Sequence, residues 1–292
     1  MTDAFEVTGV STLVEPISSV LDDLAVAVDV QETVDTTPNG FVTLGLAPEL
    51  VQAVADLGYT QPTTVQLKTI PLALPSDNAD AKKGYIDLMV SSQTGSGKTA
   101  AFLLPVLHTL LKQQAEAEAA DRAEYEKSVA DAIAKGEETP KKAKRKDPTN
   151  VRNFKAPTPG ALIVCPTREL AQQVAHDAID LVKHCRGLRV ANVVGGMPYQ
   201  LQIAKLQNAN LVVATPGRLL DLQRSMQIKL DKVQFLVVDE ADRMLDLGFA
   251  DDLAEINQLD SYHTNMGISN WNNSNTHNWC FDCKRNNLYW NF

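Results

Sequence analysis

The segment that most constrains the fold is Ser-Gln-Thr-Gly-Ser-Gly-Lys-Thr at residues 92–99. It lies between a short apolar run and a helical pattern, the context that a phosphate-binding loop requires. Glycines let backbone N–H groups converge on anionic oxygens, and the helix N-terminus adds partial positive charge. Lys98 could then reach the β- and γ-phosphates of a nucleotide, and the Thr99 hydroxyl could ligate Mg²⁺. An ordinary glycine turn before a helix is the alternative interpretation.

Short apolar runs alternate with helical patterns along the chain. The runs are Asp87–Val90, Ala161–Cys165, Val190–Val194, Leu211–Ala214 and Phe235–Val238. The predicted helices between them are Thr99–Leu111, Glu169–Cys185, Tyr199–Leu206 and Gly217–Arg224. Runs of this length and Val/Ile content are typical of buried parallel strands. The alternation predicts an α/β fold with a doubly wound, mostly parallel sheet and helices on both faces.

Two acids end the last of these runs, in Phe235-Leu-Val-Val-Asp239-Glu240-Ala241-Asp242. Carboxylates in this position lie at the edge of the sheet where ligands bind in such folds. Asp239 would hold Mg²⁺ through water, and Glu240 would orient or deprotonate an attacking water molecule. On their own, acids after a strand can simply cap the next helix.

The tetrad Asp239-Glu240-Ala241-Asp242 resembles the signature of DEAD-box RNA helicases, which belong to superfamily 2. Further elements stand in the order that this family shows: Gly58–Gln66 is similar to the Q motif, Pro166–Leu170 to motif Ia, Gly195-Gly196 to the GG element, and Thr215–Arg218 to motif Ib. The resemblance covers about residues 41 to 259. It implies an N-terminal RecA-like P-loop domain.

The resemblance implies an ATP site with Mg²⁺ as a further cofactor. Its nucleotide-binding residues are Phe41, Tyr59, Gln66, Ser92, Gln93, Thr94, Gly95, Ser96, Gly97, Lys98 and Thr99. A glutamine amide such as that of Gln66 can pair with adenine N6 and N7, which favours ATP over GTP. Phe41 or Tyr59 could stack on the ring or pack against it. The metal residues are Thr99 and Asp239, the catalytic residues are Lys98, Asp239 and Glu240, and Asp242 is expected to couple the two helicase domains.

The family resemblance also implies binding of one RNA strand, independent of its base sequence. The residues carried over are Pro166, Thr167, Arg168, Gly196, Thr215, Gly217 and Arg218. Turns between strands and helices offer backbone N–H groups and short hydroxyls to phosphates. For Arg168 and Arg218, a salt bridge within the domain is an equally weighted alternative to RNA binding.

The charge distribution is uneven. The net charge is −9, but residues 1–67 contain ten acids and no Lys or Arg, which leaves 27 basic against 26 acidic residues in the remainder. Residues 1–40 are predicted to be a disordered acidic leader, with a short helix near Val20–Val28 as the alternative. Residues 41–69 form the Q-motif region and 70–260 the ATP-binding domain. Residues 112–156 are predicted to be a solvated helical insertion with a basic loop at 141–146, which either solubilises or binds nucleic acid.

Other features exclude some classes of protein. No apolar run approaches a membrane span, and no basic signal region precedes residue 30, so we expect a cytoplasmic protein with no membrane partner. The four cysteines form no disulfide framework, and the pair Cys280 and Cys283 is interpreted as a coincidence, not a zinc site. His176, His184 and Cys165 are interpreted as helix-surface or core residues. Protein partners cannot be inferred from the sequence.

Residues 261–292 differ from the rest in composition, with nine Asn and three Trp. They lack the Ser-Ala-Thr motif that the family resemblance leads us to expect, and we expect no second RecA-like domain within these residues. We expect an aberrant, disordered tail, translated from a wrong reading frame, and a sheet that lacks one strand.

The predicted function is that of the N-terminal domain of an ATP-dependent RNA helicase, which binds ATP, Mg²⁺ and single-stranded RNA but does not unwind RNA alone. The alternatives are an inactive nucleotide- and RNA-binding fragment, or a P-loop ATPase that acts on DNA.

Overall fold

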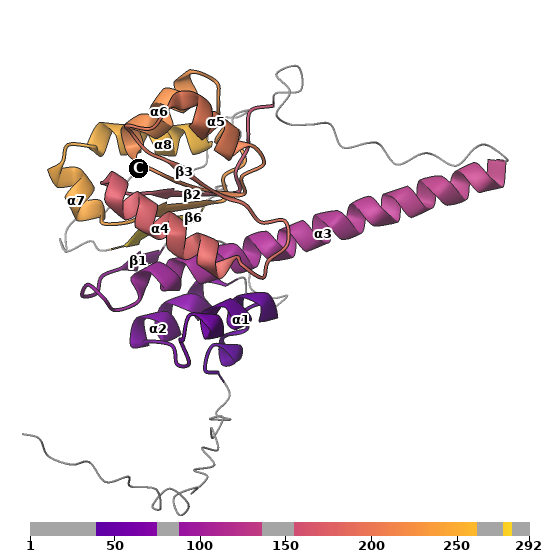
Figure 1. The fold of residues 1–292 in the computed structure, drawn as a ribbon, viewed down its shortest axis with the longest axis horizontal. Coiled ribbons are helices and arrows are strands. Elements are labelled where there is room, and N and C mark those ends of the chain that lie inside the picture. Colours follow the sequence, from indigo (N-terminus) through magenta and orange to yellow (C-terminus); the bar gives the residue numbers. More distant parts are fainter. Residues whose placement is uncertain (1–38, 75–87, 136–154, 262–276, 282–292) are drawn as a thin grey trace, which may run out of the picture. The chain divides into compact units, whose positions relative to one another are not determined.

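The structure is a computed structural model that describes residues 39–74, 88–135, 155–261 and 277–281. A six-stranded parallel sheet forms its centre (Figure 1). The strands are β1 (Leu88–Val90), β2 (Ala161–Val164), β3 (Val190–Val193), β4 (Leu211–Ala214), β5 (Phe235–Val238) and β6 (His277–Phe281), in the spatial order β1-β6-β5-β2-β4-β3. The predicted α/β class and all five predicted strand positions are confirmed. The leader, except for its last two residues, and the basic loop at 141–146 lie outside the described residues.

Alternating side chains of the central strands point to opposite faces of the sheet, and each face has its own apolar core. Ala161 and Ile163 belong to the core beneath α3 (Lys98–Lys135) and α4 (Arg168–Leu181). Leu162 and Val164 belong to the second core. That core also contains residues of α5 (Tyr199–Leu206), α6 (Pro216–Arg224), α7 (Ala241–Asp246) and α8 (Ala250–Ser261). Helices on both faces explain why the strands are apolar without alternation.

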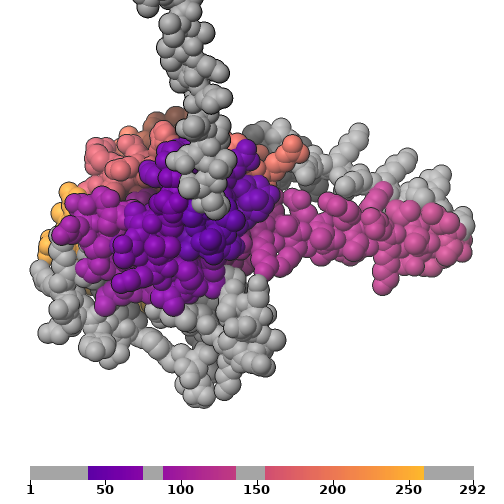
Figure 2. All heavy atoms as spheres, turned by 90° about the horizontal axis from the view of Figure 1, so that it is seen from below, coloured from indigo at the N-terminus to yellow at the C-terminus, as the bar shows by residue number. Residues whose placement is uncertain are grey.

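Three short elements precede the sheet: a 3-10 turn at Val42–Leu44 and the helices α1 (Pro48–Asp56) and α2 (Thr64–Ala73). Pro48 occupies the first turn of α1, where its missing N–H costs nothing. Gly58, just after α1, has a φ of 82°, a left-handed conformation that glycine adopts readily. Helix α2 contacts α3, so this N-terminal segment lies against the helix that follows the phosphate loop (Figure 2).

Helix α3 joins the predicted helix Thr99–Leu111 to the predicted helical insertion after it, and runs without a break to Lys135. Its first half is buried against the sheet, but every side chain from residue 115 to residue 128 is exposed. This part is rich in Ala and Glu, which are strong helix formers, so helix propensity carries it beyond the domain core. Figure 1 shows it extending away from the sheet.

One expectation from the sequence is wrong. We expected the sheet to lack a strand after α8, but β6 pairs in parallel with both β1 and β5. Val237 is the register partner of Trp279, and Leu88 is also paired with Trp279 from the other side. Strand pairing is made by backbone groups, so a segment without an apolar pattern can still occupy the position. No helix among the described residues is long and apolar enough to cross a membrane.

Candidate nucleotide and RNA site

The phosphate loop connects β1 to α3. Gly95 and Gly97 have φ values of 78° and 84°, so both need the freedom of glycine. A Cβ atom on Gly97 would lie 2.5 Å from Nε2 of Gln66, so a side chain there would displace the Gln66 amide. The Lys98 ammonium donates to the carbonyl oxygens of Ser92 and Gln93, at 2.6 and 3.0 Å. The loop therefore supplies its own oxygens to the lysine that is predicted to bind phosphates.

The Q-motif glutamine is joined to this loop. Gln66 Nε2 donates to the carbonyl oxygen of Gly97 at 3.1 Å, and the Thr63 hydroxyl donates to the carbonyl oxygen of Ser96 at 2.9 Å. The backbone N–H of Thr63 donates to Gln66 Oε1 at 2.9 Å, which completes a capping box at the start of α2. An amide group has two N–H donors and two acceptor lone pairs, so these contacts use one of each on Gln66, whose residue is 6% exposed.

The two aromatic residues predicted at the adenine differ in exposure. Phe41 is 2% exposed and belongs to the core beneath α3. Tyr59 is 57% exposed, just after Gly58. The structure therefore leaves Tyr59, and not Phe41, with a ring open to a ligand. Phe41 instead anchors the Q-motif segment to the domain.

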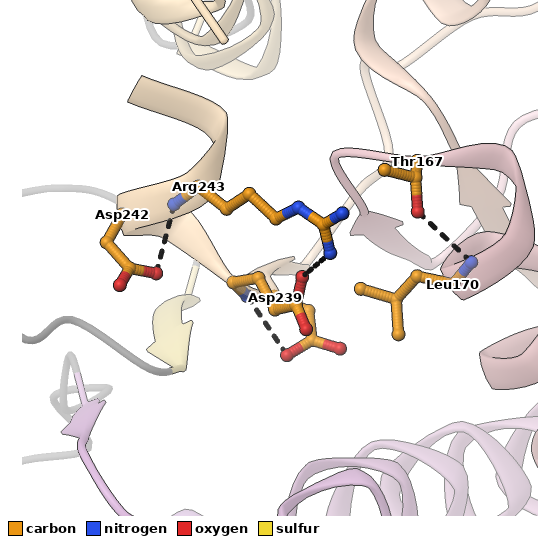
Figure 3. Close-up of polar contacts among 6 residues, drawn as sticks. Thr167, Leu170, Asp239, Asp242 and Arg243 are labelled. Atoms are coloured by element: carbon orange, nitrogen blue, oxygen red, sulfur yellow. Dashed lines mark hydrogen bonds and ion pairs between the residues drawn. The ribbon is translucent and has the colours of Figure 1, made fainter. Parts of the chain in front are cut away.

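The acidic tetrad lies at the carboxyl end of β5 (Figure 3). Asp239 is 5% exposed, and its Oδ1 accepts from the backbone N–H of Glu240 at 3.1 Å. Glu240 has a φ of 50°, a left-handed conformation that costs a non-glycine residue about 1–2 kcal/mol. Arg243 Nη1 donates to Glu240 Oε2 at 3.1 Å, the contact drawn as a dashed line from Arg243 in Figure 3. Asp242 Oδ1 accepts from the backbone N–H of Arg243 at 3.0 Å.

Buried Cys165 reports on the charge at this end of the sheet. It follows β2, the neighbour of β5. Burial raises the pKa of the Cys165 thiol, and the carboxylates of Asp239 and Glu240 raise it further. The thiol therefore stays protonated and acts as a small apolar group, as predicted for a core residue. The same proximity places the end of β2, where motif Ia begins, beside the acidic tetrad.

Motif Ia begins with a helix cap. The Thr167 hydroxyl accepts from the backbone N–H of Leu170 at 3.3 Å, so it starts α4 (Figure 3). Pro166 is buried, and Arg168 is 57% exposed, with Nη2 3.6 Å from Glu169. A contact of this length between exposed groups stabilises little, so it does not hold Arg168 inside the domain.

Motif Ib and the GG element meet at one loop. Thr215 precedes α6 without capping it through its side chain, and Gly217 is exposed. Arg218 Nη1 donates to the carbonyl oxygen of Met197 at 3.3 Å, and its guanidinium lies 4.5 Å from the centre of the Tyr199 ring. Among the described residues Arg218 forms no ion pair, so the alternative of a salt bridge does not apply to it.

Several residues that support the site were missed from the sequence. Thr63 carries a recognisable signal, because Thr-x-x-Gln before an apolar segment is typical of a capping box. Arg243, Tyr199 and Gln202 carry none. Gln202 is fully buried and donates through Nε2 to the carbonyl oxygen of Val194, the residue before the GG element. Its Oε1 has no hydrogen-bond partner among the described residues.

The fold and the loop around Lys98 define a nucleotide-binding domain of the P-loop class. A family model for DEAD/DEAH box helicases matches residues 63–272, past the boundary that we expected at 260. The chain belongs to the DEAD/DEAH box helicase family. The resemblance first seen in the acidic tetrad is thereby confirmed.

Individual relatives agree with this assignment. The chain is 35% identical over 223 residues to RNA helicase CrhR of Synechocystis sp., with 76% of this chain and 35% of the relative covered. It is 35% identical to ATP-dependent RNA helicase RhlB of Pseudomonas syringae, with 74% and 44% covered. The chain thus spans less than half the length of these relatives.

Solved structures show the same fold. A DEAD box protein from Methanococcus jannaschii is 28% identical with a TM-score of 0.56, and 83% of this chain and 49% of that chain are covered. Dbp5 of S. cerevisiae, bound to RNA and ADP BeF3, is 25% identical with a TM-score of 0.55, and the coverage is 84% and 46%.

Proposed function

We propose that this chain binds ATP with Mg²⁺ at the phosphate loop and one RNA strand across motifs Ia, GG and Ib. The observation that carries the proposal is the pair of hydrogen bonds from Thr63 and Gln66 to the carbonyl oxygens of Ser96 and Gly97. They join the segment predicted to read adenine to the segment predicted to hold phosphates. Through this link the two segments would form the two halves of one nucleotide site.

Lys98 and the N-terminus of α3 would hold the phosphates. The Lys98 ammonium would exchange the carbonyl oxygens of Ser92 and Gln93 for phosphate oxygens, which are charged and therefore stronger acceptors. A Cβ atom on Gly95 would meet nothing within 4 Å, so the space beside this glycine of the loop is open. Backbone N–H groups at the start of a helix add to this preference for anions.

Mg²⁺ fits the oxygen donors at the site. Thr99 in the first turn of α3 and Asp239 at the end of β5 would hold it, and both are oxygen ligands of the kind that Mg²⁺ prefers. When bound, the ion would neutralise charge on the phosphate oxygens. Glu240 would orient the attacking water. Arg243 forms an ion pair with Glu240 and so restrains that carboxylate.

The RNA surface is supported by exposure and by the relatives. Arg168, Gly196 and Gly217 are exposed, and Arg218 is partly exposed. The relatives' names describe RNA helicases, and Dbp5 was solved with RNA. The word helicase in these names denotes the separation of nucleic-acid strands. For this chain we propose the nucleotide- and RNA-binding steps of that activity, in place of the alternative that acts on DNA.

A fluorescent ATP analogue titrated in the presence of Mg²⁺ tests the proposal. Lys98→Ala should lose most of the binding, whereas Lys127→Ala, which removes the same charge from the exposed part of the same helix, should bind as the wild type does. Equal binding by all three proteins would refute a phosphate site at Lys98.

A further inference from the structure

The loop that contains the GG element is contacted by side chains from three helices. A Cβ atom on Gly196 would lie 2.7 Å from Nη1 of Arg168, so the guanidinium rests against this glycine. Arg218 Nη1 donates to the carbonyl oxygen of Met197. Gln202 donates to the carbonyl oxygen of Val194. Arg168 precedes this loop in the sequence and Arg218 follows it. Both arginines, which are predicted to bind RNA, therefore contact the same short loop.

Tyr199 adds a contact that none of the family motifs contains. It stands at the start of α5, one helical turn before Gln202, and its side chain is 41% exposed. The Arg218 guanidinium lies over its ring at 4.5 Å, within the range of a cation–π interaction. Arginine loses conformational freedom when its head group is fixed, so a ring that fixes it in advance lowers the cost of a later contact.

We propose that Tyr199 is a positioning residue for RNA binding, which holds the Arg218 guanidinium beside the Gly196–Met197 loop. The inference rests on the proposed RNA-binding function and names a residue on which that function depends. The guanidinium has five N–H donors, and one of them goes to Met197. Within the described parts of the chain the other donors of Arg218 have no hydrogen bond, so they can meet a phosphate while the ring keeps the group in place. Tyr199 itself need not touch the RNA.

The test uses the binding of a short fluorescein-labelled single-stranded oligouridine to this chain, followed by fluorescence anisotropy. Tyr199→Leu keeps an apolar side chain but removes the π system, and it should weaken binding about twofold to fivefold. Tyr199→Phe keeps the ring and should bind as the wild type does. Arg224→Ala is the charge control, because Arg224 lies on the same helix as Arg218 but is paired with Glu255.

A double-mutant cycle separates positioning from direct contact. In the Arg218→Ala background, Tyr199→Leu should cause no further loss, because the ring would have nothing left to position. An equal loss in both backgrounds would overturn the inference and would instead indicate that Tyr199 stacks on RNA. Retention of full binding by Tyr199→Leu alone would overturn it as well.

The contact can also be measured without RNA. In the NMR spectrum of the free protein, the Nε–H resonance of Arg218, assigned by its loss in Arg218→Lys, should carry a ring-current shift that Tyr199→Phe keeps and Tyr199→Leu removes. An unshifted resonance in the wild type would overturn the inference. No RNA binding by the wild type would contradict the proposed function and the RNA role of Tyr199 with it, even if the ring-current shift is present.

Discussion

The side-chain amide of Gln66 donates to the carbonyl oxygen of Gly97 across 31 positions of sequence, at 3.1 Å. Close by, the Thr63 hydroxyl donates to the carbonyl oxygen of Ser96. The start of α2 and the phosphate loop are therefore one hydrogen-bonded unit. A substitution at Thr63 or Gln66, which form the cap of α2, should therefore change both the free energy of unfolding and the affinity for nucleotide.

Thr63→Ala should lower the free energy of unfolding by about 1 kcal/mol, because it removes the cap of α2 and the bond to Ser96. It should also weaken nucleotide binding, since the loop loses one support. Thr64→Ala is the matched control, because Thr64 is exposed in the next position. Urea unfolding of both variants measures the difference. Equal stability of Thr63→Ala and Thr64→Ala would contradict a stabilising role of Thr63 as the cap of α2.

Gln202→Glu should destabilise the domain by about 3 kcal/mol or more, because it replaces a buried donor to Val194 with a carboxylate. Gln200→Glu adds the same charge to an exposed position of the same helix and should change stability by less than about 0.5 kcal/mol. Thermal or urea unfolding compares them. Similar stabilities would show that Gln202 is accessible to water.

Asp56 links α1 to the segment after α4 and should make stability depend on pH. A hydrogen bond from His184 at 2.7 Å, together with the charges of His184 and Lys183, lowers the pKa of Asp56 below its ordinary value of 3.8. A carboxylate whose folded-state pKa is depressed stabilises the fold above its unfolded pKa, and that contribution disappears as the pH falls through the folded pKa.

The stability difference between the wild type and Asp56→Asn should therefore shrink as the pH falls below the ordinary value of 3.8. Urea unfolding at several pH values measures this difference. Asp180→Asn, which removes a similar contact to His176 on the surface of α4, is the control. A difference that does not change across this range would refute the role of Asp56.

The sequence predicted the strands and the phosphate loop because these depend on local patterns. The bounds of Leu211–Ala214 and Phe235–Val238 agree with the structure, since apolar runs that end in polar residues mark the strands. A solvated helical insertion was predicted after Leu111 from its composition, but its unbroken continuation of the preceding helix to Lys135 was not, because this part has helix propensity and no apolar stripe. Strand β6 was not predicted, because its pairing rests on backbone groups that leave no pattern in the sequence.

The contacts that support the site could not be predicted from local sequence patterns either, because they join segments that are distant in the sequence. Tyr199 meets Arg218 only because the loops after β3 and β4 come together at one edge of the sheet. Gln202 has the appearance of a surface residue in a short amphipathic helix, yet it is buried under the GG element. Phe41 was predicted at the adenine, but its position in the core is set by packing between distant segments.

We propose that this chain holds ATP through Gln66 and Lys98. Isothermal titration calorimetry with ATP and GTP, each with Mg²⁺, tests it most directly. The wild type should bind ATP in preference to GTP, Gln66→Ala should lose this preference, and Lys98→Ala should lose affinity for both nucleotides. Equal binding of ATP and GTP by the wild type, or undiminished binding by Lys98→Ala, would contradict it.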